Sequence, residues 1–141
     1  MENYIHKVQY YETDKMQCAH HSNYIRWMEE ARVNFLEKIG FGYDKLEKQG
    51  IVSPVIGIEC EFKEPTYFGD EVEIKVNVEE FKGVKLVIGY EMINKTTGKL
   101  TLIGQSKHCF INKDNRPIIL RKEFPDFDKK LKEIVKNNDN F

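Results

Sequence analysis

The sequence predicts an α+β fold in which one long helix packs against an antiparallel β-sheet. Apolar residues recur at helical spacing between residues 24 and 39, and from residue 54 onward they recur at every second position. Short glycine-containing turns separate the strand-like segments, and such turns favour hairpins between neighbouring strands. The order of a strand, a long helix and then about four strands is typical of the α+β class.

The long helix is predicted to begin at Ser22 or Asn23, either of which can cap its first turn, and to end before Gly40. Its apolar stripe consists of Tyr24, Trp27, Met28, Ala31, Phe35 and Ile39, whereas charged residues such as Arg32 fall outside the stripe. Three further apolar residues lie off this stripe: Ile25, Val33 and Leu36. We therefore expect a strongly curved sheet that covers the helix on several sides.

The other elements are predicted from the same patterns, in chain order. They are a strand at residues 4–11, a short helix at 43–49, strands at 54–62, 71–80, 84–92 and 100–111, and a small amphipathic helix after Pro125. In the 54–62 segment the alternation places Ile56, Ile58, Cys60 and Phe62 on one face. The 100–111 segment is apolar on parts of both faces, which predicts a central strand.

Length and composition narrow the class of protein. The 141 residues suggest a single domain over residues 1–141. A net charge of -1 without a basic stripe argues against nucleic acid as a partner, and no run approaches the ~20 apolar residues of a membrane span. The N-terminus lacks the apolar core of a signal peptide. The three cysteines are odd in number and widely separated, so we expect no disulfide framework and a cytoplasmic location.

Reactive side chains concentrate in the loop that precedes the long helix. Residues 12–22 lack apolar periodicity and contain Asp14, Cys18, His20 and His21. The loop leads directly into the helix N-terminus, whose backbone N–H groups favour negative charge, including a developing oxyanion. The sequence contains no G-x-S-x-G motif, which argues against a serine hydrolase of that kind.

The same region resembles a known family. The segments Tyr10-Tyr11-Glu12-Thr13-Asp14, His20-His21-Ser22-Asn23-Tyr24 and Glu29-Glu30-Ala31-Arg32 closely resemble the hydroxybenzoyl-CoA thioesterase-like family of acyl-CoA thioesterases. The resemblance implies the hotdog fold, one long central helix wrapped by a curved antiparallel β-sheet. It also implies that Asp14 is the catalytic carboxylate, with Tyr10 and His21 as supporting residues. We assign His20, Asn23 and Tyr24 to substrate binding. One departure is Gln17, which stands where the family usually has glycine.

The implied reaction is hydrolysis of an acyl-CoA thioester. Asp14 would attack the thioester directly or act as general base on a water, and backbone N–H groups around residues 21–23 would stabilise the oxyanion. No metal or prosthetic group is expected, since coenzyme A enters as part of the substrate. Its phosphates require basic residues, and the candidates are Lys63, Lys85, Lys107 and Arg116. The resemblance implies a homodimer or homotetramer with the active site near a subunit interface. The sequence does not identify the acyl group of the substrate.

The same residues are compatible with other structures and functions. Asp14 can cap a turn, and Tyr10 can be a core aromatic residue whose hydroxyl is bonded. Asp14, Cys18, His20 and His21 could together bind a transition metal, although their spacing matches no familiar zinc pattern. A hotdog protein that binds acyl-CoA or lipid without turnover is a further alternative.

Overall fold

The structure is a computed structural model that describes residues 2–139. Its backbone contacts form two compact units. The first contains residues up to Phe35, Cys60–Val76 and Tyr90–Gly104, and the second contains Leu36–Glu59, Asn77–Gly89 and the residues from Gln105 onward. The single domain over residues 1–141 stays a prediction.

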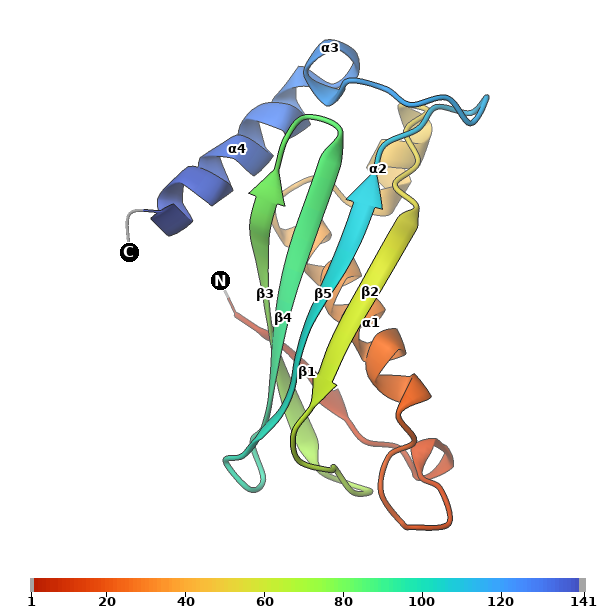
Figure 1. The fold of residues 1–141 in the computed structure, drawn as a ribbon, viewed down its shortest axis with the longest axis vertical. Helices are drawn as coiled ribbons and strands as arrows, with labels where there is room; N and C mark the ends of the chain where they lie inside the picture. The colour runs from red at the N-terminus through yellow and green to blue at the C-terminus, as the bar shows by residue number, and fades with distance from the viewer. Residues whose placement is uncertain (1, 140–141) are drawn as a thin grey trace. The chain divides into compact units, whose positions relative to one another are not determined.

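The elements follow the predicted order (Figure 1). They are β1 (Tyr4–Lys7), the short 3₁₀ helix η1 (Tyr10–Glu12), α1 (Ser22–Lys38), α2 (Tyr43–Lys48), β2 (Val55–Phe62), β3 (Glu71–Phe81), β4 (Lys85–Asn94), β5 (Leu100–Cys109), α3 (Leu120–Glu123) and α4 (Pro125–Asp139). The sheet has five strands in the order β1-β3-β4-β5-β2. The α+β class is therefore confirmed, and so is the internal position of the strand predicted at 100–111.

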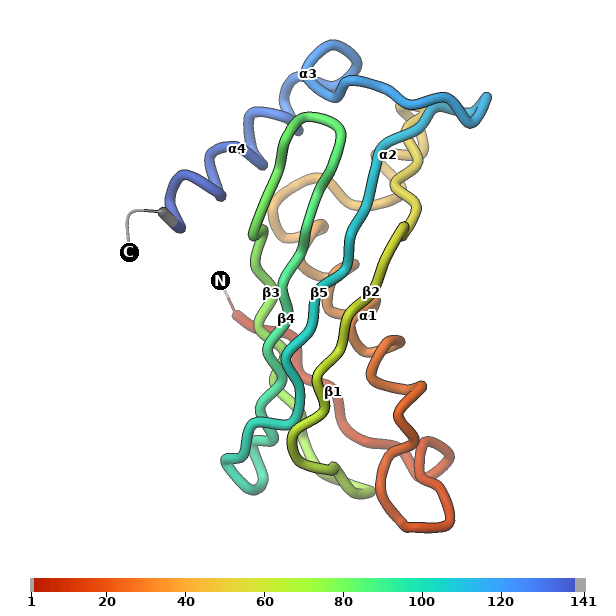
Figure 2. Tube along the Cα trace, viewed as in Figure 1, coloured from red at the N-terminus to blue at the C-terminus, as the bar shows by residue number. Residues whose placement is uncertain are grey.

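Short turns connect the strands, as Figure 2 shows along the chain. The turn between β3 and β4 is closed by a 3.0 Å hydrogen bond from Lys82 N–H to Lys85 O, with Gly83 at φ +81°. The turn between β4 and β5 is closed by a 2.9 Å hydrogen bond from Asn94 N–H to Lys99 O. At the edge of the sheet, β1 pairs antiparallel with β3, and His6 lies opposite Val72.

The first strand is shorter than predicted. It ends at Lys7 instead of residue 11, because Val8 N–H bonds to Asp70 O and the chain then turns into η1. The carboxylate of Glu12 accepts the Gln9 N–H at 2.8 Å, which stabilises this turn. The alternation of bulky residues continues beyond Lys7, so it does not mark where the strand ends. The strand ends there because the chain turns into η1, and the Glu12 side chain stabilises that turn.

Five of the six residues in the stripe predicted for α1 are buried, whereas Ile39 is half-buried and lies just beyond the end of the helix. Trp27 and Met28 are fully buried, and Tyr24, Ala31 and Phe35 are nearly so. Two residues differ from the prediction: Ile25 is exposed, whereas Arg32 is buried and donates a 3.1 Å hydrogen bond to the hydroxyl of Tyr90 in β4. Within the first unit, α1 also reaches β2, because the Cys60 Sγ lies 3.6 Å from the Met28 Sδ.

The strand β2 has the predicted position, but its apolar face is not covered. Ile56, Ile58 and Phe62 are 58%, 36% and 52% exposed. The strand is the last in the order of the sheet, so one of its sides has no neighbouring strand within the described residues.

The second unit is built around aromatic packing. Phe41 stacks on Phe127 of α4 with ring centroids 4.9 Å apart. Phe110 packs edge-on against Phe127, and Phe124 packs edge-on against Phe41. The helices α2 and α4 confirm the helices predicted at 43–49 and after Pro125, whereas the single turn of α3 was not predicted.

Candidate active site

Asp14 lies in a small loop that backbone hydrogen bonds close. His20 N–H donates to Glu12 O at 2.8 Å, Asp14 N–H donates to Cys18 O at 3.0 Å, and Thr13 pairs with Ala19 in an antiparallel bridge. The side chain of Asp14 is half-buried, and its Oδ1 accepts the Met16 N–H at 2.8 Å. The Cys18 Sγ lies 3.9 Å from the same oxygen. Asp14 thus occupies a defined position beside Cys18 and Ala19.

Gln17 lies at the tip of this loop, at the position where the resembling family usually has glycine. Its φ is +69°, in the left-handed region that L-residues rarely adopt, and its N–H donates to Asp14 O at 2.9 Å. The loop therefore keeps the backbone conformation that explains the glycine preference. The departure at Gln17 adds a side chain and backbone strain at this position.

The start of α1 is held differently from the prediction. The Ser22 N–H donates to the imidazole Nδ1 of His20 at 3.2 Å, so the cap comes from a histidine rather than from Ser22 or Asn23. Asn23 is buried and its amide donates to Glu12 O at 2.9 Å and to His20 O at 3.3 Å. Both residues therefore connect the Asp14 loop to α1, and their assignment to substrate binding stays a prediction.

A pocket of about 260 Å³ opens beside the start of α1. It is lined by Ala19, His21, Tyr24, Phe62, Lys63, Glu64, Pro65 and Thr101. His21 and Tyr24 are therefore brought together at this pocket, whereas Asp14 and Tyr10 are not among the described residues that line it. Asp14 is nevertheless close in the fold, because its loop contains Ala19. Tyr10 is 77% exposed, and its ring lies edge-on to Phe68 at 5.7 Å.

Tyr24 forms a buried wall of the pocket. It is 4% exposed, its hydroxyl lies 3.0 Å from the Thr66 Oγ1, and its ring packs edge-on against Trp27 and Phe62. Burial raises the pKa of Tyr24, although the hydrogen bond with Thr66 acts in the opposite direction. Tyr24 is therefore neutral at physiological pH, and its hydroxyl contacts Thr66.

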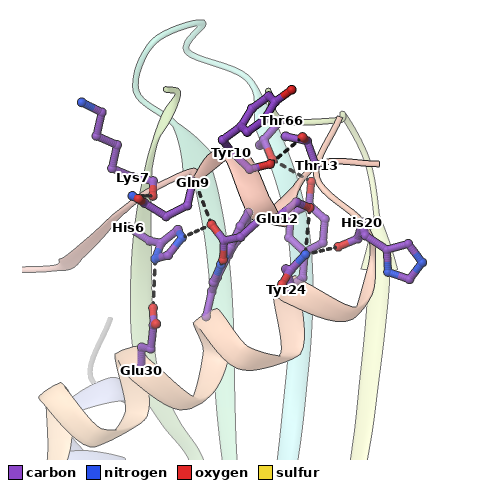
Figure 3. Close-up of polar contacts among 12 residues, drawn as sticks. His6, Lys7, Gln9, Tyr10, Glu12, Thr13, His20, Tyr24, Glu30 and Thr66 are labelled. Atoms are coloured by element: carbon purple, nitrogen blue, oxygen red, sulfur yellow. Dashed lines mark hydrogen bonds and ion pairs between the residues drawn. The ribbon is translucent and has the colours of Figure 1, made fainter. Parts of the chain in front are cut away.

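Glu12 is the important residue of this region that sequence reasoning missed. It is 4% exposed, and its carboxylate accepts hydrogen bonds from the Gln9 N–H and from the imidazole Nε2 of His6 at 2.8 Å (Figure 3). It also accepts one from the indole N–H of Trp27 at 2.7 Å. Burial alone would raise the pKa of Glu12, but these hydrogen bonds outweigh it and lower the pKa. The sequence contained one indication of a role for Glu12, namely its position two residues before the candidate catalytic residue Asp14.

The remaining predictions concern the basic residues for the phosphates, metal binding, the cysteines and membrane-spanning helices. Lys63 lines the pocket and its Nζ lies 2.7 Å from the Glu61 carboxylate, whereas Lys85, Lys107 and Arg116 belong to the second unit. Within residues 2–139, no group of three or more His, Cys, Asp or Glu side chains is placed to hold a metal ion. All three cysteines are free thiols. None of the described helices is long and apolar enough to span a membrane.

Comparisons with known proteins agree with this architecture. The model of the thioesterase-like superfamily matches residues 8–135. YneP of Bacillus subtilis, named as a candidate acyl-CoA thioesterase, is 37% identical over 122 residues, which cover 86% of this chain and 88% of YneP. The DHNA-CoA thioesterase of Staphylococcus aureus superposes with a TM-score of 0.93 at 33% identity, covering 99% of this chain and 93% of that one. The gentisyl-coenzyme A thioesterase BH1999 superposes with a TM-score of 0.77 at 26% identity, covering 86% and 98% of the two chains. These similarities confirm the predicted hotdog fold and the predicted enzyme class, and the chain belongs to the thioesterase-like superfamily of thioester hydrolases.

Proposed function

We propose that the protein hydrolyses acyl-CoA thioesters and that Asp14 is the essential carboxylate. The observation that carries this proposal is the closed loop of residues 12–20, which holds a half-buried Asp14 beside Ala19 of the pocket and next to the start of α1. A carboxylate held in a fixed position near a pocket and a helix N-terminus has the parts that acyl transfer requires. No metal or prosthetic group takes part in the proposed reaction.

Two routes are open to Asp14. As a nucleophile, its carboxylate adds to the thioester carbonyl, the C–S bond breaks, and coenzyme A leaves as a thiol after protonation; water then hydrolyses the resulting anhydride. As a general base, Asp14 takes a proton from water while that water attacks the same carbon. Both routes place negative charge on the carbonyl oxygen.

The oxyanion is expected at the start of α1. Asn23 N–H already donates to His20 O at 3.0 Å and Ser22 N–H to the His20 imidazole, so the His21 N–H is the best placed of the predicted donors. The dipole of the 17-residue helix adds partial positive charge at this end. The His21 imidazole lines the same pocket and would position the substrate or the water.

We propose an aromatic acyl group as the part of the substrate that enters the pocket. Tyr24 and Phe62 supply aromatic walls, and Pro65 adds a rigid apolar contact. The solved structures from Staphylococcus aureus and of BH1999 are named for DHNA-CoA and gentisyl-coenzyme A, both of which carry aromatic acyl groups. Lys63 at the pocket wall is the proposed partner for a phosphate of coenzyme A, because it is the basic residue among those that line the pocket.

We also propose that the enzyme works as a homo-oligomer joined through β2. The strand lies at the edge of the sheet and exposes Ile56, Ile58 and Phe62, and unpaired strand edges invite pairing. Phe62 also lines the pocket, so a second copy seated on β2 would lie beside the site. Size-exclusion chromatography with light scattering tests this proposal: a dimer or tetramer that Ile56→Lys dissociates supports it, and a monomeric wild type contradicts it.

The first experiment is thiol release from a panel of acyl-CoAs that includes DHNA-CoA, benzoyl-CoA and short and long aliphatic chains. Wild type is compared with Asp14→Asn, which keeps nearly the same size but removes the carboxylate. We expect Asp14→Asn to lose about 10²–10⁴-fold in kcat. The matched control is Asp114→Asn, in an exposed turn of the second unit, which should retain full activity.

The outcomes of this experiment separate the alternatives. An active Asp14→Asn variant contradicts the assignment of Asp14 but leaves the thioesterase activity in place. Tight binding of acyl-CoA by a wild type that releases no thiol from any substrate instead supports the non-catalytic binding protein.

A further inference from the structure

The imidazole of His6 lies between two carboxylates in the first unit. Its Nε2 is 2.8 Å from the Glu12 Oε1, and its Nδ1 is 2.9 Å from the Glu30 Oε2 (Figure 3). His6 itself is 8% exposed, and its ring stacks on the indole of Trp27 with centroids 4.5 Å apart. His6 lies outside the motif that contains Asp14, and the proposed reaction does not use it.

The hydrogen-bond donors around Glu12 determine its protonation state. Its Oε1 faces the Gln9 N–H as well as His6, and its Oε2 faces the Trp27 N–H. Backbone and indole N–H groups can only donate, so both carboxylate oxygens accept hydrogen bonds, and these bonds lower the pKa of Glu12. Glu12 is therefore ionised, and the Nε2 of His6 must donate to it.

The second ring nitrogen faces a carboxylate that is open to solvent. The side chain of Glu30 is 43% exposed, and its Oε2 also lies 3.2 Å from the Tyr4 hydroxyl. A carboxylate accepts hydrogen bonds and cannot supply one to Nδ1, so the Nδ1 of His6 is the donor in this contact. The face of the Trp27 indole adds a further favourable contact for a cation.

From this geometry we propose that His6 is an imidazolium held between Glu12 and Glu30, and that this cation positions the Asp14 loop. Glu12 transmits the effect, because its main-chain carbonyl accepts the His20 N–H and the Asn23 amide that close the loop. Asp14 follows two residues later on the same backbone. His6, Glu12 and Glu30 are thus positioning residues that act through Asp14, and this inference rests on the proposed function only where activity is concerned.

The charge of His6 can be measured directly. We would record ¹⁵N–¹H spectra of the imidazole rings and the backbone amides of the whole protein between about pH 6 and 9.5. We expect two N–H groups on the His6 ring at pH 7.5. As the second proton is lost at higher pH, we expect the amide signals of Asp14 and Gln17 to shift together with the ring signals. A His6 with a single ring N–H at pH 7.5, or loop amides that do not follow His6, would overturn the proposal.

A charge-only variant provides the kinetic test. Glu30→Gln keeps an oxygen near Nδ1 and removes one of the two negative charges that favour the imidazolium. We expect kcat of wild type to fall at alkaline pH as His6 loses its second proton. In Glu30→Gln this fall should occur at lower pH, by at least about one pH unit. The thermal midpoint and KM at pH 6.5 should change little. The matched control is Glu29→Gln at the neighbouring exposed position of α1, whose pH profile should superpose on that of wild type.

The two readouts distinguish the two proposals. If wild type is active and Glu30→Gln has an unchanged pH profile, the positioning role is wrong and the thioesterase assignment survives. If wild type releases no thiol, the proposed function fails, and the coupled ring and amide signals still decide whether a charged His6 positions the loop.

Discussion

The indole Nε1–H of Trp27 donates a 2.7 Å hydrogen bond to the Glu12 Oε2 in the buried part of the first unit. This contact joins the central helix α1 to the short helix η1, and the Asp14 loop begins directly after η1. A core tryptophan and a buried carboxylate thereby connect the packing of α1 to the position of the candidate catalytic residue.

Glu12→Gln should lower the free energy of unfolding at pH 7 by about 3 kcal/mol, because the new NH2 group would oppose the donor of Gln9 or that of Trp27, depending on which oxygen it replaces, and the negative charge opposite His6 is lost. The pKa of Glu12 is lowered in the folded state, so its ionised form stabilises the fold above the ordinary pKa of about 4.3. This stabilisation is lost as the pH falls through the lowered folded value. Urea unfolding between about pH 2.5 and 7 measures both effects.

The control for this prediction is Glu47→Gln, at an exposed position of α2. It should keep the acid dependence of wild type, whereas Glu12→Gln should show a weaker one. An unaltered acid dependence in Glu12→Gln would contradict the role of its carboxylate.

Gln17→Gly should stabilise the protein, by a net of about 0.5 kcal/mol. Glycine removes the strain of a side chain at φ +69°, and the larger entropy of the unfolded chain offsets part of this gain. Gln49→Gly is the matched control: Gln49 has φ -84°, so glycine there should destabilise by about 0.5–1 kcal/mol. Thermal unfolding of the two variants should therefore show shifts of opposite sign.

Tyr24→Phe should destabilise the fold by about 1–2 kcal/mol, because it leaves the fully buried hydroxyl of Thr66 without its 3.0 Å partner. The double variant Tyr24→Phe/Thr66→Val should recover part of this loss. Since the Tyr24 hydroxyl contacts Thr66 while its ring lines the pocket, kcat/KM should fall by less than about tenfold. A larger loss with normal stability would show that the hydroxyl itself contacts the substrate.

Gly89→Ala tests a close approach on the sheet in the second unit. A Cβ on Gly89 would overlap the Glu79 side chain, whose carboxylate accepts a hydrogen bond from the Gln105 amide. We expect a loss of about 1 kcal/mol in wild type, because Glu79 must move and this hydrogen bond breaks. In a Glu79→Ala background the same change should stabilise by about 0.5 kcal/mol, since alanine costs less backbone entropy than glycine. Equal effects in both backgrounds, measured by a double-mutant cycle, would contradict this explanation.

Much of the fold could be predicted because it depends on local periodicity. The stripe from Tyr24 to Phe35 and the alternation in β3 each specify one element and its buried face, and the structure places both as expected. β2 shows the limit of this reasoning, because alternation identifies a strand but not whether anything covers its apolar face.

The candidate site could be predicted only in part. Asp14, His21 and Tyr24 were identified from a motif, and the structure brings His21 and Tyr24 to one pocket with the Asp14 loop beside it. Glu12 and His6 were missed because their importance comes from partners far away along the chain, namely Trp27 and Glu30.

The sequence by itself determined the element order, the buried face of α1 and the loop that contains Asp14, because spacing and motif are local properties of the chain. Only the tertiary structure decided that His20 caps α1, that Arg32 is buried against Tyr90 and that Glu12 accepts hydrogen bonds from His6 of β1, from the Gln9 N–H and from Trp27 of α1. The physical reason is that a polar side chain can be buried wherever the fold supplies its hydrogen-bond partners, and the partners of Arg32 and of the Glu12 Oε2 come from segments far away in the sequence.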